Sequence, residues 1–150
     1  MPVDYLTRRV FAGQVARAGE SGIVALAYVN KDSEKIPFGV FVCAKDNGCA
    51  KITKATDQIL GVSLKLGSKN ENKPGQVMSV LALPHGTEIW VQGKSAHGLD
   101  IGDDVGIEAT AGDDAGKVAK TPTLALTAAK GKFYVTGVEG DFIKIMRKEA

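Results

Sequence analysis

The sequence has little of what most enzymes and metalloproteins depend on. Of its 150 residues, only two are cysteine and two are histidine. Cys43 and Cys49 do not form a CxxC pair, and there is no second pair to complete a zinc site. A disulfide across the short loop between them is geometrically possible. In a reducing cytoplasm, however, two free thiols without a metal are the expected state.

Residues able to carry catalysis are equally sparse. His85 and His97 each precede a glycine and are interpreted as turn residues. There is no Gly-x-Ser-x-Gly nucleophile elbow and no phosphate-binding glycine loop of the Walker or Rossmann type. Asp103-Asp104 and Asp113-Asp114 lack the ligand spacing of an EF-hand, so they are interpreted as solvated turns. The sequence predicts no catalytic residue, no metal ligand and no cofactor.

A strong charge bias and a long apolar run are also missing. The net charge is +2, from 19 basic and 17 acidic residues. The densest basic clusters, Arg8-Arg9 and Arg147-Lys148, do not make the basic stripe of a nucleic-acid binder. No apolar stretch approaches the ~20 residues that span a bilayer, and Met1 to Arg9 lack a signal-peptide core. We expect neither nucleic acid nor membrane as a partner, and synthesis in a cytoplasm.

What the sequence does have is 18 glycines and many short apolar runs. Asn47-Gly48 and Pro74-Gly75 are turn signals between such runs. Trp90 alternates with Ile89 and Val91, and we expect it in the core or partly buried in a sheet rather than as an anchor for a partner. About eight to ten strands at this spacing are typical of an all-β sandwich or barrel. The clearest predicted strands cover residues 23–29, 40–44, 59–64, 76–83, 87–92, 132–138 and 142–146.

No internal repeat or linker divides the chain, so a single domain is expected. Residues 1–22 are interpreted as an extended N-terminal arm or a first strand, and residues 23–150 as the sandwich or barrel domain. Phe11 and Phe38 lie where an arm or an edge strand is plausible, so they could anchor a partner or pack in the core.

Several segments, taken together and in order, resemble the structural cement, or capsid decoration, family of tailed bacteriophages. The most specific are Phe-Ala-Gly-Gln at residues 11–14 and Ile-Pro-Phe-Gly at residues 36–39. The others are Gly-Val-Ser-Leu at 61–64, Pro-Gly at 74–75 followed by Val-Met-Ser-Val at 77–80, Gly-Thr-Glu-Ile-Trp-Val at 86–91 and Gly-Asp-Asp-Val at 102–105.

This resemblance implies a jelly-roll-like sandwich or barrel without enzymatic activity or cofactor. It implies a homo-oligomer, a dimer or a trimer, bound to the major capsid protein on the capsid exterior of a virion and made in the host bacterial cytoplasm. Two other functions are weighed against it: a carbohydrate- or receptor-binding β-module on a virion surface, and a small hydrolase on a β-barrel. The residues predicted to contact the capsid protein are Phe11, Ala12, Gly13, Gln14, Ile36, Pro37, Phe38 and Gly39.

Overall fold

The computed structural model describes residues 12–17, 25–54, 56–65, 71–82, 86–120 and 133–147, which form strands and no helix. Within these ranges there is accordingly no helix that could span a membrane. The all-β prediction is confirmed. The strands are β1 (Val15–Arg17), β2 (Ala25–Val29), β3 (Phe41–Lys45), β4 (Gly48–Lys51), β5 (Ile59–Ser63), β6 (Val77–Leu81), β7 (Glu88–Gln92), β8 (Gly106–Ile107), β9 (Val118–Ala119), β10 (Phe133–Glu139) and β11 (Phe142–Arg147).

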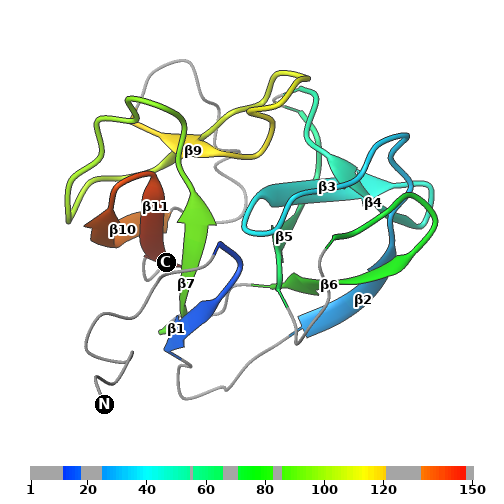
Figure 1. The fold of residues 1–150 in the computed structure, drawn as a ribbon, viewed down its shortest axis with the longest axis horizontal. Helices are drawn as coiled ribbons and strands as arrows, with labels where there is room; N and C mark the ends of the chain where they lie inside the picture. The colour runs from blue at the N-terminus through cyan, green and yellow to red at the C-terminus, as the bar shows by residue number, and fades with distance from the viewer. Residues whose placement is uncertain are drawn as a thin grey trace, which may run out of the picture.

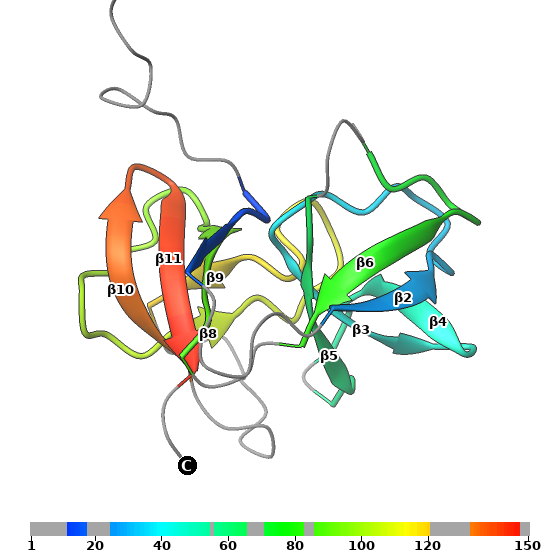
Figure 2. The same cartoon turned by 90° about the horizontal axis from the view of Figure 1, so that it is seen from below.

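Most of the strands belong to two antiparallel sheets that lie side by side (Figures 1 and 2). Sheet I has the order β1-β7-β11-β10, and sheet II has the order β2-β6-β5-β3-β4. The short strands β8 and β9 pair with each other. In sheet I the last strand in the sequence, β11, lies between β7 and β10.

The main core lies between the two sheets. On β7 and β11, Ile89 pairs with Ile145 and Val91 with Ile143, and all four side chains are fully buried. Their polar or larger neighbours alternate on the other side of the sheet, as the period of two in the sequence predicts. From sheet II, Phe41 meets Phe133 of sheet I with ring centroids 5.2 Å apart. One core therefore joins both sheets.

Sheet II buries its second face as well. Phe41 and Cys43 face the main core, whereas Val42 between them packs in a smaller core with Ile36 and Met78. The sheet curls until its two edges approach, since Lys31 N–H donates to the Cys49 carbonyl at 2.8 Å. Burial on both faces explains why the first three residues of β3, Phe41, Val42 and Cys43, are all apolar and do not alternate with polar residues.

The hairpin between β3 and β4 has the predicted tight turn, but one residue earlier than Asn47-Gly48. Asp46 and Asn47 hold the two left-handed positions, with φ of 48° and 64°, and Gly48 already pairs with Lys45. A side chain on Gly48 would collide with the Val29 carbonyl oxygen. The glycine is therefore required for the close approach of β2, and Asp and Asn supply the turn.

The N-terminal segment, residues 1–22, contributes one strand to the described fold. Val15 of β1 pairs with Ile89 of β7 at the edge of sheet I. The boundary between residues 22 and 23 lies outside the described residues.

Candidate functional site

The two segments predicted to contact a partner lie against each other. Gly13 donates its N–H to the Trp90 carbonyl at 2.7 Å, and its own carbonyl accepts from Lys65 N–H at 3.0 Å. Residues 12–14 therefore connect β7 of sheet I to the end of β5 in sheet II. We call residues 12–14 together with residues 37–39 the glycine seam.

The other half of the seam repeats this pattern. Gly39 donates its N–H to the Ser63 carbonyl at 2.8 Å, and its carbonyl accepts from Gln92 N–H at 2.8 Å. The Gln92 side-chain amide also donates to the Phe38 carbonyl at 2.7 Å. The seam is thus a backbone clamp between the two sheets.

Both glycines are required by the geometry. Gly13 and Gly39 have φ of +79° and +74°, in the left-handed region that L side chains rarely adopt. A Cβ atom on Gly39 would lie 2.6 Å from Gly13 N and 2.7 Å from the Ala12 Cβ. No side chain fits between residues 12–13 and residue 39, which accounts for the glycine in each of the two motifs.

The structure sorts the predicted contact residues by exposure. Gln14 and Pro37 are exposed, and Ala12 and Phe38 are half-buried. Three residues are buried and hold the backbone in place: Gly13, Ile36 and Gly39. Phe11 lies outside the described residues. The part of the seam that a partner can reach is therefore formed by the exposed and half-buried residues, Ala12, Gln14, Pro37 and Phe38.

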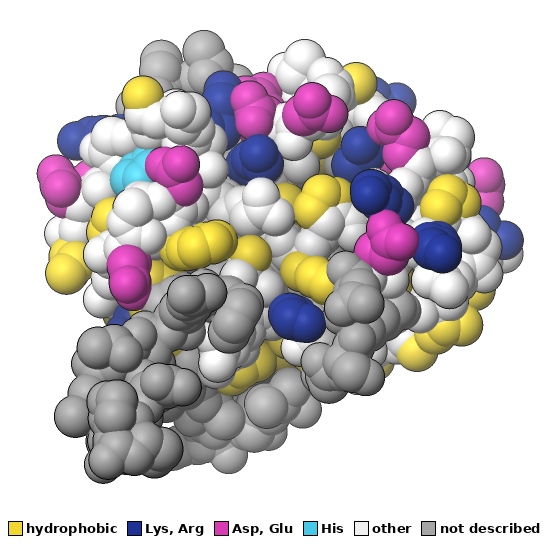
Figure 3. Space-filling model, in the orientation of Figure 1, with side chains coloured by type: hydrophobic (Ala, Val, Ile, Leu, Met, Phe, Trp, Pro, Cys, Tyr) yellow, Lys and Arg dark blue, Asp and Glu magenta, His cyan; other side chains and the backbone are white. Residues whose placement is uncertain are grey.

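A basic side chain borders the accessible part of the seam. Lys65 Nζ lies 5.2 Å from the centre of the Phe38 ring, within cation–π range. We call Gln14, Pro37, Phe38 and Lys65 the seam surface. Figure 3 shows hydrophobic side chains in the middle of the displayed face, between the two sheets, with acidic and basic side chains interspersed around them.

Trp90 is half-buried on the side of sheet I that faces away from the main core. Lys144, its cross-strand partner on β11, places Nζ 5.6 Å from the centre of the indole ring. Of the two expectations for Trp90, the partly buried sheet position is confirmed. The same side of the sheet carries Phe142, Met146 and Tyr134, all half-buried. We call this surface the outer face of sheet I.

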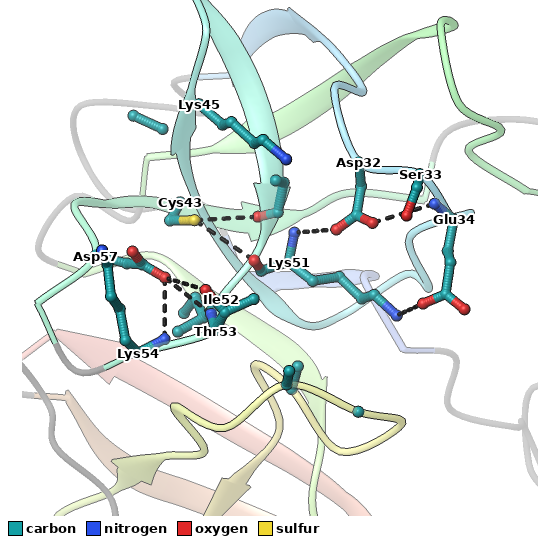
Figure 4. A pocket seen from close by; sticks show the side chains of 15 residues that line it. Asp32, Ser33, Glu34, Cys43, Lys45, Lys51, Ile52, Thr53, Lys54 and Asp57 are labelled. Carbon is teal, nitrogen blue, oxygen red and sulfur yellow. Dashed lines mark hydrogen bonds and ion pairs between the residues drawn. The ribbon is translucent and has the colours of Figure 1, made fainter.

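A pocket of about 450 Å³ lies beside the β3–β4 hairpin (Figure 4). Its carboxylates are engaged within the protein. Asp57 accepts the backbone N–H groups of Thr53 at 2.8 Å and Lys54 at 3.1 Å, and Asp32 accepts Lys51 N–H at 3.0 Å. These bonds hold the pocket's own loops, so none of the bonded carboxylates has the environment of a general base.

Cys43 borders this pocket but is not an activated nucleophile. Burial, assisted by the Asp57 charge, raises the pKa of the Cys43 thiol to about 12. Burial and the Asp32 charge raise the pKa of Cys49 to about 11. Both thiols are free, as expected. They face opposite sides of the hairpin, since Cys43 pairs with Ala50 whereas Cys49 pairs with Ala44, so no disulfide can join them.

Three of the other polar residues considered from the sequence, His97, Asp103 and Asp114, hold loops together. His97 Nδ1 accepts Leu99 N–H at 2.9 Å, and Asp103 accepts Asp100 N–H at 2.9 Å. Asp114 pairs with Lys117 at 3.2 Å. His85 lies outside the described residues. Within the described ranges, no three His, Cys, Asp or Glu side chains come together as a metal site would need.

Comparisons with known proteins agree on one kind of protein. The family model described as XM1 gp53 minor capsid protein matches residues 2–146. A chain in the solved structure of the capsid of Myoviridae phage XM1 has the same fold, with a TM-score of 0.68 at 17% identity, over 96% of this chain and 95% of that one. No curated protein sequence matches. The expected relationship to phage capsid proteins is confirmed: the chain belongs to the XM1 gp53 minor capsid protein family and is a structural protein of a phage capsid.

Proposed function

We propose that the protein cements the capsid of a tailed phage, binding its outer surface and bridging neighbouring subunits of the major capsid protein. The observation that carries this proposal is the family match over residues 2–146. A minor capsid protein has the shell as its partner, and a cement protein contributes by holding adjacent shell subunits together.

The seam surface is the contact we propose for the shell. Phe38 offers a half-buried aromatic ring beside the cation of Lys65. Its backbone is fixed by the Gln92 side chain, so binding orders few additional groups and costs little conformational entropy. A rigid aromatic anchor of this kind is a common source of interface affinity.

Mass action then explains the stabilisation of the shell. A protein that binds assembled subunits but not separated ones stabilises the assembly by its binding free energy. A capsid repeats the same site many times by symmetry, so about 4 kcal/mol per copy, a millimolar affinity, adds up over one particle.

The chemistry of the described residues supports a non-enzymatic role. The two thiols remain protonated at neutral pH, since burial raises their pKa values to about 12 and about 11. The pocket carboxylates Asp32 and Asp57 are bonded to backbone N–H groups of their own loops. These groups supply structure, which agrees with a protein that acts by binding.

The proposal is tested on particles prepared with and without the protein. Decorated particles should release their genome at a higher temperature than bare ones, and should resist removal of divalent ions longer. Equal release from both, with full occupancy confirmed on the decorated particles, would contradict cementing. It would favour a receptor- or carbohydrate-binding module on the virion surface.

A pair of variants tests the contact itself. Phe38→Ala removes the aromatic anchor of the seam surface, and Ile101→Ala removes an apolar side chain that is 72% exposed in a turn beside β10. Phe38→Ala should weaken binding to bare particles by about tenfold or more, whereas Ile101→Ala should bind like the unmodified protein. Equal binding of both variants would place the contact elsewhere.

A further inference from the structure

The tip of the β3–β4 hairpin carries an asparagine followed by a glycine, a pair that none of the other three asparagines forms. Asn47 is exposed and Gly48 is buried. Asparagine is among the thermolabile residues, because the backbone nitrogen of the next residue can attack its side-chain amide carbon. A glycine in the next position leaves that nitrogen least hindered, since it has no Cβ atom. The hairpin tip therefore has the local chemistry of a deamidation site.

The reaction at this pair needs only water as a co-reactant. The backbone nitrogen of Gly48 attacks Cγ of Asn47, so a new C–N bond closes a succinimide ring. The bond from Cγ to Nδ2 breaks, and the amide nitrogen leaves as ammonia with the proton that the backbone nitrogen has lost. Water then opens the ring at one of its two carbonyl carbons. One opening gives aspartate, and the other gives isoaspartate, in which the main chain runs through the former side chain.

The native turn keeps the attacking nitrogen from reacting. Asp46 and Asn47 occupy the two loop positions with φ of 48° and 64°, and Gly48 lies opposite Lys45. In a tight turn the N–H of the fourth residue donates to the C=O of the first, which here assigns the Gly48 N–H to the Lys45 carbonyl. The Gly48 backbone is also so close to β2 that a Cβ atom would lie 2.3 Å from the Val29 carbonyl oxygen. The nitrogen can reach the Asn47 side chain only after this end of the hairpin opens.

The isoaspartate product does not fit the same turn. It adds one C–C bond, about 1.5 Å, to the backbone of a two-residue loop, and so displaces the pairing of the strands beside it. Gly48 has no space into which it could move, because a Cβ atom there would also lie 2.6 Å from Lys31 Cγ. The next residue, Cys49, accepts the Lys31 N–H at 2.8 Å and thereby joins β4 to β2. A displaced Gly48 would therefore break the contact between the two edges of sheet II.

We propose that Asn47 is a modification site whose deamidation is held back by the native hairpin, and whose isoaspartate product opens the contact between β2 and β4. A reaction that requires local opening proceeds at a rate set by the population of the open form. This inference goes beyond the cementing function, because it concerns how long each copy keeps its native hairpin and not what the protein binds.

The first experiment compares the reaction in the folded and unfolded protein. The whole chain is incubated at mildly alkaline pH with and without urea, and the peptide that contains residue 47 is followed by mass spectrometry. Asn47 should deamidate in urea and react at least about tenfold more slowly in the native protein, which corresponds to ~1.4 kcal/mol of opening free energy. Asn30, which is buried and precedes a lysine, serves as an internal control and should stay unmodified in the native protein.

A pair of variants on one loop tests whether opening of the hairpin controls the rate. Asp32→Ala removes the carboxylate that accepts the Lys51 N–H of β4 at 3.0 Å. It should speed native deamidation of Asn47 by about threefold or more, since one hydrogen bond that holds β4 is lost. Glu34→Ala removes only the ion pair with Lys51 Nζ, in which Glu34 is 70% exposed, and should leave the rate unchanged. Both variants should react like the unmodified protein in urea.

The effect of the product is measured on the protein refolded after deamidation in urea. The isoaspartyl form is separated by ion exchange and compared with Asn47→Asp, which has the same new charge without the longer backbone. Hydrogen exchange at the Lys31 N–H should be at least about tenfold faster in the isoaspartyl form, because its bond to Cys49 is the contact that opens. An isoaspartyl form that does not refold, beside a folded Asn47→Asp, would equally show that the turn cannot accept the longer backbone.

Three results would overturn the proposal. Absence of deamidation at Asn47 in urea would remove the site, and equal rates with and without urea would remove the control by the hairpin. An isoaspartyl form whose Lys31 N–H exchanges like that of Asn47→Asp would show that the edges of sheet II stay closed. If Asp32→Ala does not fold, the comparison of native and urea-unfolded protein still decides the point. None of these measurements involves particles, so a failure of cementing would leave them unaffected.

Discussion

Gly39 is the residue on which the contact between the two sheets depends most directly. Its φ is +74°, and a Cβ atom there would meet Gly13 N at 2.6 Å. Gly75 has a similar φ of +83°, yet a Cβ atom there would have no neighbour within 4 Å. At both positions an alanine would have to adopt an unfavourable left-handed backbone conformation. Only at Gly39 would its Cβ atom also collide with neighbouring atoms.

Alanine at these two glycines should separate the two effects. Gly75→Ala should lower the free energy of unfolding by about 1 kcal/mol, the left-handed backbone cost. Gly39→Ala should lower it by about 3 kcal/mol or more, since the seam backbone must also move. Denaturant unfolding measures both, and equal losses would mean that the seam yields without strain.

The buried thiols give a second prediction at this scale. Cys43 and Cys49 have pKa values raised to about 12 and about 11, mainly by burial, so the reactive thiolate is scarce at pH 8. A thiol-specific reagent should label the native protein far more slowly than the denatured one, which should take up two equivalents. Rapid native labelling at pH 8 would contradict the burial of both side chains.

At the scale of elements, one ion pair joins the residues after β7 and β8. Lys94 donates to Glu108, with side chains 29% and 12% exposed. This bond lowers the pKa of Glu108 and raises the pKa of Lys94. Because the folded pKa of Glu108 is below its unfolded value of about 4.3, the stabilisation is present above that value. It is lost as the pH falls through the folded pKa.

Removing this pair should have a pH-dependent effect. At pH 7, Glu108→Gln should lower the free energy of unfolding by about 1 kcal/mol. The difference from the unmodified protein should shrink as the pH falls below about 4. Glu71→Gln serves as the control, since its pair with Lys35 is 3.3 Å long and mostly exposed and should contribute little. Equal effects of the two changes at pH 7 would refute a special role for Glu108.

Elements with a clear local pattern were predictable from the sequence. The strands β2, β3, β5, β6, β7, β10 and β11 each fall within or close to a predicted segment. The two-residue strands β8 and β9 were missed, because their pairing arises from tertiary contacts and leaves no period in the sequence. The insertion of β11 between β7 and β10 likewise depends on long-range pairing.

The candidate site was predictable only in part. The motifs around Gly13 and Gly39 could be selected from the sequence, but their mutual contact could not, since 26 positions separate two glycines that each look like ordinary turns. The outer face of sheet I was within reach, because Trp90 and Lys144 both alternate with buried residues. The sequence pattern does not reveal the register between β7 and β11 that places Trp90 beside Lys144.

At the scale of the whole molecule, the shared core predicts that both sheets unfold together. Phe41 of sheet II and Phe133 of sheet I pack ring against ring at 5.2 Å. Trp90, the single tryptophan, reports on sheet I alone, whereas far-UV circular dichroism reports on both sheets. The two signals should give the same midpoint on heating or in denaturant. Separate midpoints would show that each sheet folds independently.

The unfolding midpoint should fall when the contact between Phe41 and Phe133 is removed. Phe41→Ala should lower the free energy of unfolding by about 3–5 kcal/mol, because a fully buried aromatic side chain leaves a cavity. Both signals should shift by the same amount. Leu26→Ala, at a side chain that is 46% exposed on β2, should cost far less. A comparable loss in both variants would indicate that Phe41 is not part of a shared core.

The position of β11 has a consequence for how the protein is made. Synthesis proceeds from the N-terminus, so β1, β7 and β10 all emerge before the strand that must lie between β7 and β10. Until Phe142–Arg147 has been translated, both neighbours keep open edges, and the main core lacks Ile143 and Ile145. Open edges of this kind favour association with other chains. A nascent or prematurely terminated chain is therefore prone to aggregate, and only chains translated through β11 can complete sheet I.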